Sequence, residues 1–283
     1  MSIKTVAILG AGVMGCDLAL DLAAHQIDII LKDLNEDALE RADASMRKNY
    51  KVYRMMRSDR FNRPMSELRA RIRLVTDYAV FETADMVIEN ITEDLKEKES
   101  VYRKLPDVCR KEIIIGSNTS CISITTLASF VPYPENVVGI HFLNPIPLKN
   151  LVEIIRGFHT SEDTLVKTQA FMNDIGKSWI VVKDYPGFVT NRVLMLTINE
   201  SIWLVQDKVS IPQDIDKIFR LGFGHKMGPL ATADLIGLDT ILDSLFVLFQ
   251  SYKDPKYRPC PLLQKMVDAG LLGRKTGEGF FKY

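Results

Sequence analysis

The chain has 283 residues, and its 36 basic and 36 acidic residues give a formal net charge of zero. This balance supplies no bulk attraction to nucleic acid or to a membrane surface. The length allows one or two domains with a sizeable core. The four cysteines show no C-x-x-C spacing, and no run is long and uncharged enough to cross a bilayer. We therefore expect a cytoplasmic protein without a disulfide framework or a metal site.

The first motif is a glycine turn near the start of the chain. An apolar run at residues 6–9 leads into Gly10-Ala11-Gly12-Val13-Met14-Gly15, and a helix-like stretch at 16–24 follows. A second apolar run, residues 27–31, ends just before Asp33. A G-x-G-x-x-G turn between strand and helix lets the backbone approach a pyrophosphate, and the helix N-terminus favours the phosphates. The pattern predicts dinucleotide binding rather than a merely structural turn.

Asp33 bears on which dinucleotide is bound. A carboxylate at this position accepts hydrogen bonds from the adenosine ribose and repels a 2′-phosphate. NAD is therefore expected rather than NADP, although the neighbouring Lys32 would weaken that preference.

Alternating strands and helices continue to about residue 116. Short apolar runs at 72–75, 86–89 and 113–116 are interleaved with a charged helix at 95–109. This alternation predicts a doubly wound, mostly parallel α/β sheet, whose ligands bind at the carboxyl ends of the strands. Two polar stretches lie at such ends: residues 89–93, continuing to Lys98, and Ser117-Asn118-Thr119-Ser120. The second stretch is typical of a helix cap, and it could also bind a cofactor.

A histidine and a glutamate lie on two later apolar runs. The run 137–141 ends in His141, a turn rich in proline includes Asn144, and the run 151–155 carries Glu153. If the runs pair as antiparallel strands, His141 lies opposite Glu153, with Cβ atoms about 5 Å apart. A carboxylate at that range orients an imidazole and favours its protonated form, as in a general base. The alternative is a core histidine satisfied by a buried acid.

Residues 35–57 read as a long helix capped by Asn35, with a basic second half that includes Lys48, Lys51 and Arg54. Such a charge run usually forms a solvated helix face. A ligand that carries phosphates, such as coenzyme A, is the alternative on these residues alone. Residues 65–71 are expected to form a second helix in a hairpin with the first.

Asp184-Tyr185-Pro186-Gly187 predicts a domain boundary. Before it, Ser161 is expected to cap a helix to residue 175, and residues 179–182 form a last strand. Beyond it nothing reads as β, and helices are expected at 188–205, 212–221, 229–249 and 261–269. The sequence thus predicts a Rossmann-type domain at residues 1–184 and an all-helical domain at residues 185–283.

Several motifs in the same order resemble the 3-hydroxyacyl-CoA dehydrogenase family, especially its short bacterial members. They are GAGVMG, SNTS, HFLNPIP with LVEIIRG, DYPGFVTNR, HKMGPLATADLIGLD and LLGRKTGEGFFKY. The resemblance covers essentially the whole chain. It implies NAD-dependent, reversible oxidation of an (S)-3-hydroxyacyl-CoA to the 3-oxoacyl-CoA, and a homodimer formed through the helical domain.

The resemblance also implies roles for individual residues. His141 would be the catalytic acid or base and Glu153 its orienting partner, while Ser120 and Asn191 would hold the substrate oxygen. The basic helix would bind the coenzyme A phosphates through Lys48, Lys51 and Arg54. The expected cofactor-binding residues are Gly10, Gly12, Val13, Met14, Gly15, Asp33, Glu93, Lys98, Asn118 and Asn144.

Three residues depart from the family pattern. Cys121 stands where a second serine is usual, Asn90 where alanine is common, and Lys226 within a motif that usually reads HPMGP. These departures leave the acyl preference open, and also the carrier, coenzyme A or an acyl carrier protein. A non-catalytic dinucleotide-binding or structural protein is a further alternative, which the set of His141, Glu153, Ser120 and Asn191 argues against.

Overall fold

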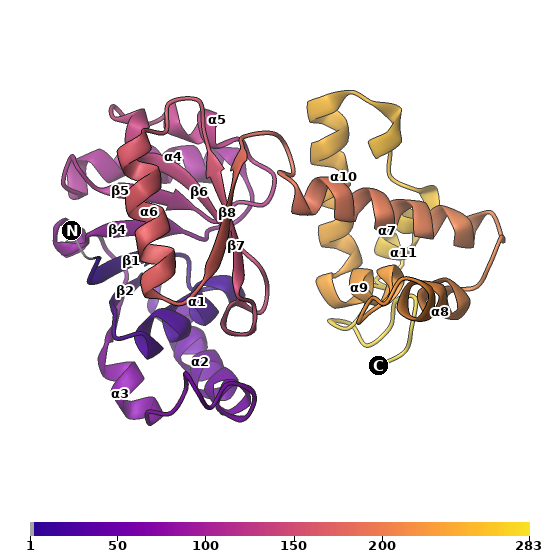
Figure 1. Ribbon diagram of the computed structural model, residues 1–283, viewed down its shortest axis with the longest axis horizontal. Helices are drawn as coiled ribbons and strands as arrows, with labels where there is room; N and C mark the ends of the chain where they lie inside the picture. Colours follow the sequence, from indigo (N-terminus) through magenta and orange to yellow (C-terminus); the bar gives the residue numbers. More distant parts are fainter. Residues whose placement is uncertain (1–2) are drawn as a thin grey trace. The chain divides into compact units, whose positions relative to one another are not determined.

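The structure, a computed structural model, describes residues 3–283. The chain divides into two compact units, Met1–Asp184 and Tyr185–Tyr283, each of which is described by itself (Figure 1).

The first unit is built on one eight-stranded sheet with the order β3-β2-β1-β4-β5-β6-β7-β8. Strands β1 to β6 are parallel, β7 runs antiparallel to β6, and β8 is parallel to β7. The predicted doubly wound, mostly parallel sheet is thereby confirmed. The strands are β1 Thr5–Leu9, β2 Asp28–Lys32, β3 Ile72–Val75, β4 Met86–Glu89, β5 Ile114–Ser117, β6 Val137–Phe142, β7 Leu151–Arg156 and β8 Ser178–Lys183.

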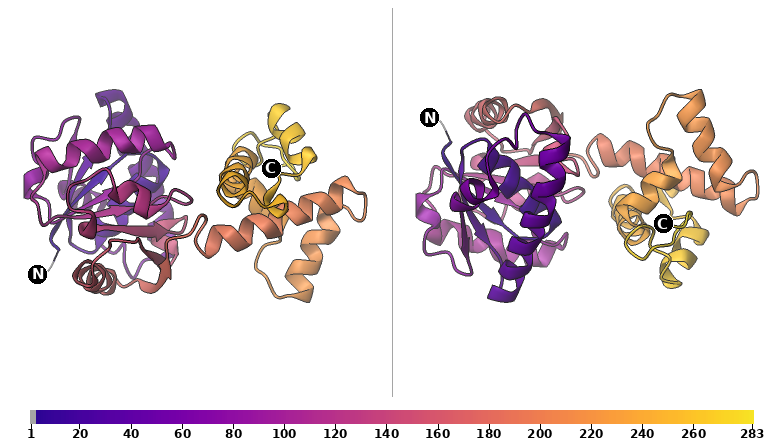
Figure 2. Two further views of the ribbon diagram at one scale, coloured as in Figure 1. Left: turned by 90° about the horizontal axis from the view of Figure 1, so that it is seen from above. Right: turned by 90° about the horizontal axis from the view of Figure 1, so that it is seen from below.

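Helices lie on both faces of this sheet, as Figure 2 shows from two sides. Their bounds are α1 Val13–Ala24, α2 Glu36–Met56, α3 Met65–Ala70, α4 Leu95–Val108, α5 Ile124–Ala128 and α6 Glu162–Asp174, with short 3₁₀ turns η1 Phe81–Thr83, η2 Pro134–Asn136 and η3 Ile146–Leu148. The expected caps are present, since the side chain of Asn35 accepts from Ala38 N and that of Ser161 from Thr164 N. Each cap satisfies an N–H group that the first helical turn leaves without an intrahelical partner.

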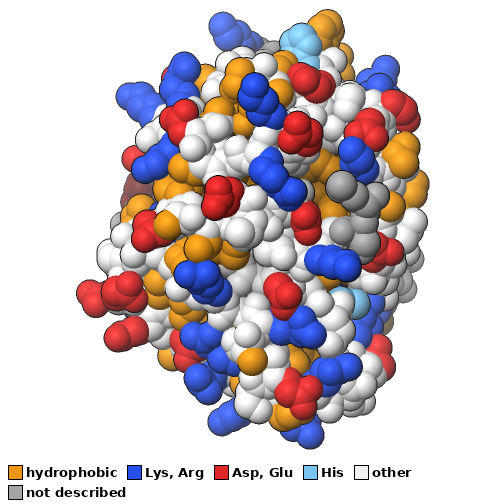
Figure 3. All heavy atoms as spheres, turned by 90° about the vertical axis from the view of Figure 1, so that its left-hand side faces the viewer, with side chains coloured by type: hydrophobic (Ala, Val, Ile, Leu, Met, Phe, Trp, Pro, Cys, Tyr) orange, Lys and Arg blue, Asp and Glu red, His pale blue; other side chains and the backbone are white. Residues whose placement is uncertain are grey.

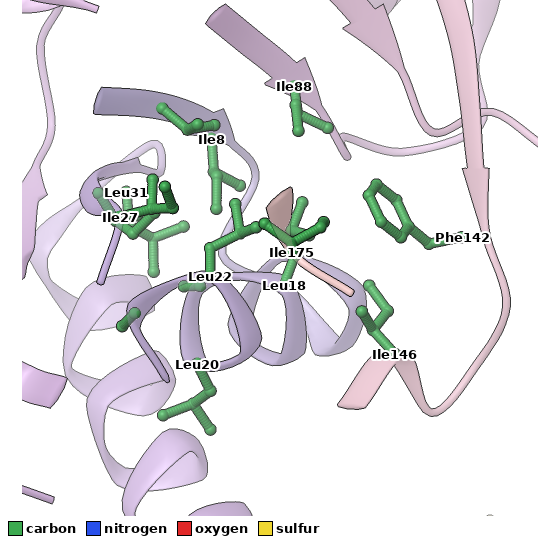
Figure 4. Packing of buried hydrophobic residues seen from close by; sticks show 14 of the residues in the cluster. Ile8, Leu18, Leu20, Leu22, Ile27, Leu31, Ile88, Phe142, Ile146 and Ile175 are labelled. Carbon is green, nitrogen blue, oxygen red and sulfur yellow. The ribbon is translucent and has the colours of Figure 1, made fainter. Parts of the chain in front are cut away.

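One apolar cluster joins α1, α2 and α6 to the same face of the sheet. In Figure 4, Leu18 of α1 lies near Phe142 at the end of β6, Ile146 of η3 and Ile175 at the end of α6. The turn between β6 and β7 is thus packed onto the helix that follows the glycine turn. On the other face, Tyr102 of α4 and Leu127 of α5 are fully buried.

The second unit has its own core, formed by apolar side chains of its helices. Its elements are α7 Thr190–Gln206, α8 Pro212–Gly222, α9 Pro229–Ile236, α10 Leu238–Tyr252, η4 Pro255–Tyr257 and α11 Pro261–Asp268. The single helix expected over residues 229–249 is wrong: Gly237 adopts φ +106° and ends α9 before α10 begins. The expectation of no β structure also needs a small correction, because isolated bridges join Gly273 to Glu278 and Glu278 to Lys282.

Within residues 3–283, no helix is both long and apolar enough to span a membrane. On the face drawn in Figure 3, basic and acidic side chains are interspersed, in keeping with the zero net charge.

Candidate active site

The glycine turn is closely packed at two of its glycines and open at the third. Gly10 adopts φ +92°, and a Cβ atom there would lie 2.6 Å from the Asn90 carbonyl oxygen. A Cβ atom on Gly12 would meet nothing within 4 Å, and Gly12 precedes α1 without a side-chain cap. Gly12 and Val13 are exposed. The uncapped N–H groups at the start of α1 therefore face open space, which suits a pyrophosphate.

Asp33 is fixed beside this turn by main-chain donors. Its Oδ2 accepts from Ala11 N at 2.7 Å and its Oδ1 from Leu34 N at 2.7 Å. Lys32 does not pair with this carboxylate: its Nζ donates to the Asp33 carbonyl oxygen at 3.3 Å and lies 4.6 Å from the centre of the Tyr78 ring. Burial lowers the pKa of Lys32. The residue that was expected to weaken the preference for NAD is thus held against an aromatic ring.

Main-chain hydrogen bonds join the carboxyl ends of the central strands. Asn90 N donates to Leu9 O at 2.7 Å, and Asn118 N donates to Glu89 O at 2.9 Å. Asn118 Oδ1 accepts from Phe142 N at 2.9 Å. Asn118 Nδ2 also donates to the Asn90 side chain at 2.7 Å, so the asparagine that departs from the family pattern orients Asn118. The glycine turn and the end of the strand that carries His141 therefore both lie at the edge of the sheet formed by the carboxyl ends of its strands.

His141 and Glu153 are directly opposed in the antiparallel pair of β6 and β7, which confirms the expected register. The Nδ1 atom of His141 lies 2.8 Å from Glu153 Oε2, and its Nε2 atom lies 3.2 Å from Ser120 Oγ. His141 and Glu153 are buried. Because Glu153 holds Nδ1, it orients the ring and leaves Nε2 directed toward Ser120.

The residues next to His141 and Glu153 show to which face of the sheet these two side chains project. Ile140, Phe142, Val152 and Ile154 belong to the cluster beneath α1. Side chains alternate along a strand, so His141 and Glu153 project to the opposite face, where α5 packs. On that face, a Cβ atom on Gly139 would lie 2.9 Å from Ile124 of α5.

A buried ion pair supports the loop before Ser120. The Lys98 ammonium lies 2.6 Å from Glu89 Oε1 and 3.5 Å from Glu93 Oε2. Glu93 Oε1 accepts from Thr119 Oγ1 at 2.5 Å, Ser120 N at 2.9 Å and Cys121 N at 3.0 Å. Glu93 and Lys98 are therefore connected to the loop of Ser120.

Glu89 and Ser117 belong to this arrangement; the sequence placed them at the start of the two polar strand-end stretches but gave neither an individual role. Ser117 Oγ donates to Glu89 Oε2 at 2.8 Å. Burial raises the pKa of Glu89, and the Lys98 ammonium opposes that change. The sequence feature that could have indicated a role for Glu89 is its position at the end of an otherwise apolar strand, nine residues before Lys98.

The sequence also singled out Asn144, Asn191 and Cys121. Asn144 is exposed in the turn between β6 and η3. Asn191 lies in the first turn of α7, in the second unit. Cys121 is buried beside Ser120.

The basic helix α2 borders a groove of about 650 Å³. Lys51 and Arg54 line it, whereas the expected Lys48 is exposed on the same helix and is not part of the lining. The remaining lining residues are Arg47, Tyr50, Met55 and Met65. A cationic groove with an aromatic and two thioether side chains can hold a phosphorylated nucleoside.

Two family models cover the chain. Residues 5–185 match the NAD binding domain of 3-hydroxyacyl-CoA dehydrogenase, and residues 187–283 match its C-terminal domain.

Individual relatives match over nearly their full lengths. The chain is 41% identical to a probable 3-hydroxybutyryl-CoA dehydrogenase of Bacillus subtilis, over 100% of the chain and 98% of the relative. It is 34% identical to the mitochondrial hydroxyacyl-coenzyme A dehydrogenase of Sus scrofa, over 99% and 91%. The crystal structure of (S)-3-hydroxybutyryl-CoA dehydrogenase PaaH1 from Ralstonia eutropha matches with a TM-score of 0.90 and 38% identity, covering 100% of this chain and 99% of that one. The glycine turn beside Asp33 and the hydrogen-bonded residues Ser120, His141 and Glu153 lie at the edge formed by the carboxyl ends of the parallel strands. The protein belongs to the 3-hydroxyacyl-CoA dehydrogenase family of NAD-dependent oxidoreductases.

Proposed function

We propose that this protein interconverts a short-chain (S)-3-hydroxyacyl-CoA, such as 3-hydroxybutyryl-CoA, and the corresponding 3-oxoacyl-CoA. The observation that carries this proposal is the chain of contacts from Ser120 Oγ through the His141 ring to Glu153. In this arrangement the His141 Nε2 atom faces the proposed substrate side, and the Glu153 carboxylate holds the Nδ1 atom.

In the oxidative direction, His141 Nε2 takes the proton of the 3-hydroxyl group. Glu153 accepts from Nδ1–H and stabilises the charge that develops on the ring. Ser120 donates to the reacting oxygen, and the proposal gives Asn191 a second hydrogen bond to that oxygen. In the reductive direction His141 returns the proton.

NAD, when bound, supplies the hydride acceptor, and the chain supplies its binding and orientation. The open space at Gly12 and the uncapped start of α1 would hold the pyrophosphate, together with Gly10, Val13, Met14 and Gly15. Asp33 would hold the adenosine ribose. We assign the nicotinamide end to Glu93, Lys98, Asn118 and Asn144.

Lys51 and Arg54 would bind the phosphates of coenzyme A in the groove beside α2, and Lys48 would add charge at its rim. Met55 and Met65, which line the groove, would offer apolar contact to the adenine ring. The first unit would thus bind the cofactor and the carrier, while the helical unit at residues 185–283 would complete the substrate site.

A second candidate substrate is a hydroxyacyl group on an acyl carrier protein. Met55 and Met56 are strongly exposed beside Arg54, at 87% and 60%. An apolar patch next to basic side chains is the kind of surface that an acidic protein partner contacts.

We also propose that the protein is a homodimer formed through the helical unit. Exposed apolar side chains cluster along α8 and the loop before it, at Val209, Ile211, Ile218, Leu221 and Phe223. Sedimentation of the wild type and of Leu221→Glu/Phe223→Glu tests this, because the substitutions should yield a folded monomer. We further propose a cytoplasmic location, which the free thiols of Cys16, Cys109 and Cys260 support.

The test of the proposed function is NADH oxidation by the purified protein with acetoacetyl-CoA, with NADPH in parallel. Rapid turnover that depends on NADH supports the reaction, the carrier and the cofactor together. NADH binding without turnover, followed by activity on an acyl carrier protein thioester, would favour the second candidate. A protein that fails to bind NADH would contradict the proposal.

A further inference from the structure

A second buried ionic cluster lies in the first unit, outside the site described above. The Lys177 ammonium, between α6 and β8, lies 2.7 Å from Asp21 Oδ2 of α1. Both side chains are wholly shielded from solvent. Burial lowers the pKa of Lys177, and Asp21 opposes that change. Two charges are costly to bury, so their remaining contacts indicate what the pair does.

The other contacts of Lys177 are with the turn that joins the strands of His141 and Glu153. Its Nζ donates to Ile146 O at 2.7 Å and to Lys149 O at 2.9 Å. Two of the three ammonium protons are thus donated to carbonyl oxygens, and Asp21 contributes the opposite charge as an ion-pair partner. One side chain therefore connects both ends of η3 to helix α1.

Two arginines approach the same turn from the loop after α2. Arg57 Nη1 donates to Pro147 O and to Asn150 Oδ1, each at 3.3 Å. Arg60 Nη2 donates to Asn150 Oδ1 at 3.3 Å, and its Nη1 lies 3.8 Å from Asp21 Oδ1. The turn is thus held by three cations, and Asp21 supplies buried negative charge among them.

Apolar packing acts at the same place. Figure 4 shows Ile146 and Phe142 directed toward Leu18 of α1 and toward Ile175, two residues before Lys177. Apolar contacts are non-directional, whereas hydrogen bonds to two carbonyl groups fix the orientation of the turn. The buried cation therefore adds a directional constraint to an apolar contact.

We propose that Lys177, paired with Asp21, is a positioning residue that holds the β6–β7 turn and thereby keeps Glu153 aligned with the His141 ring. This inference rests on the proposed function. Strands β6 and β7 are joined by this turn, so a displacement of the turn changes how His141 and Glu153 are aligned across the pair. A displacement of about 1 Å at reacting groups can lower a rate about 10²-fold.

The test uses the double variant Asp21→Asn/Lys177→Met. Removing Lys177 alone would leave a buried carboxylate without its ammonium partner, whereas the double variant removes both charges together. We expect kcat for acetoacetyl-CoA reduction to fall about 10- to 100-fold. The dissociation constant of NADH should stay within about twofold, because α1 and the glycine turn are retained.

Two comparisons separate positioning from general loss of stability. Asp17→Asn alters another buried aspartate of α1, whose carboxylate binds Tyr53 Oη and Asn49 Nδ2 rather than the turn. It should lower the melting temperature and leave kcat unchanged. In a Glu153→Gln background, the double substitution should lower kcat by no more than about twofold, because the alignment that it disturbs is already lost.

The outcomes are distinct. A folded double variant with the kcat of the wild type, or a loss of the same size in the Glu153→Gln background, overturns the inference. If the double variant does not fold, Lys177→Arg is measured alone and in the Glu153→Gln background, because it keeps the buried positive charge but removes the single nitrogen that binds both carbonyl oxygens. A lowered kcat that is not additive with Glu153→Gln supports the inference, and an unchanged kcat overturns it. An inactive wild type would contradict the proposed function instead.

Discussion

A Cβ atom added to Gly15 would lie 1.8 Å from the carbonyl oxygen of Gly10. At Gly12, in the same turn, the added atom would meet nothing within 4 Å. The two glycines are therefore required for different reasons, one by the fold and the other by the ligand.

Gly12→Ala and Gly15→Ala separate these reasons. Gly15→Ala should lower the free energy of unfolding by roughly 3 kcal/mol or more, because backbone atoms must move. Gly12→Ala should leave the melting temperature nearly unchanged and weaken NADH binding at least about tenfold, since its methyl group occupies the space assigned to the pyrophosphate. Thermal unfolding and fluorescence titration with NADH measure the two effects. Tight NADH binding by Gly12→Ala would contradict the assignment.

The His141–Glu153 pair predicts a loss of chemistry without a loss of cofactor binding. His141→Ala should lower kcat by about 10²- to 10⁴-fold, and Glu153→Gln should also lower kcat strongly because the amide no longer carries the compensating charge. NADH should bind both variants as it binds the wild type. Steady-state kinetics with acetoacetyl-CoA and NADH titrations provide the measurements. Near-normal turnover by His141→Ala would show that another group transfers the proton.

Asp33 is predicted to set the preference for NADH over NADPH. In Asp33→Ala, the acceptor for Ala11 N is lost together with the charge that repels a 2′-phosphate. The ratio of kcat/KM for NADH to that for NADPH should fall at least about tenfold. Asp28→Asn is the matched control, because Asp28 lies at the other end of β2 and pairs with Arg71. An equal change of the ratio in both variants would contradict this role.

The groove beside α2 predicts which part of the substrate the basic side chains recognise. Lys51→Ala/Arg54→Ala should raise KM for acetoacetyl-CoA about tenfold at low salt and leave kcat unchanged. With acetoacetyl-pantetheine, which lacks the nucleotide, the same variant should behave as the wild type. Lys48→Ala, outside the groove lining, should have a smaller effect. An equal KM change for the truncated substrate would show that the groove does not bind the nucleotide.

Asp85 predicts part of the acid sensitivity of the first unit. Burial alone would raise its pKa, but the N–H groups of Lys4 and Thr5 and the Arg110 guanidinium hold this pKa below its usual value. Its stabilisation is therefore present above the unfolded-state pKa of about 3.9 and is lost as the pH falls through the lower folded-state value.

Asp85→Asn should cost about 1 kcal/mol of unfolding free energy at neutral pH. The difference from the wild type should shrink as the pH falls below about 4. Urea unfolding followed from pH 7 to pH 3 measures this. A difference that does not change with pH would exclude the assigned charge effect.

Local sequence patterns predicted most of the first unit and the central contact of its candidate site. The glycine turn, the cap at Asn35 and the pairing of His141 with Glu153 depend on neighbouring residues or on one hairpin, so spacing alone located them. The helix break at Gly237 was missed because the apolar period continues through it. Only the positive φ angle of that glycine shows that the helix ends there.

The buried ion pairs of the first unit could not be predicted in the same way. Lys177 is far from Asp21 in sequence, and no local pattern relates an apolar helix to the residue before an edge strand. Glu89 and Lys98 are closer together, but a charged pair nine residues apart is usually solvent-exposed. Burial, which sequence does not give directly, distinguishes these pairs from ordinary surface charges.

The order of the elements has a consequence for how the protein could be recombined. Residues 10–33 contain the glycine turn and Asp33, while the Ser120–His141–Glu153 chain lies in residues 117–156. Residues 89–98 lie between the two segments in sequence, and Glu89 and Glu93 contact the second segment at Ser117 and Ser120. A chimaera that joins two homologues between residues 34 and 88 would inherit from one parent the residues proposed to bind the pyrophosphate and adenosine ribose of NAD. From the other parent it would inherit Ser120, His141 and Glu153 together with Glu89 and Glu93, the carboxylates that hold the loop of Ser120.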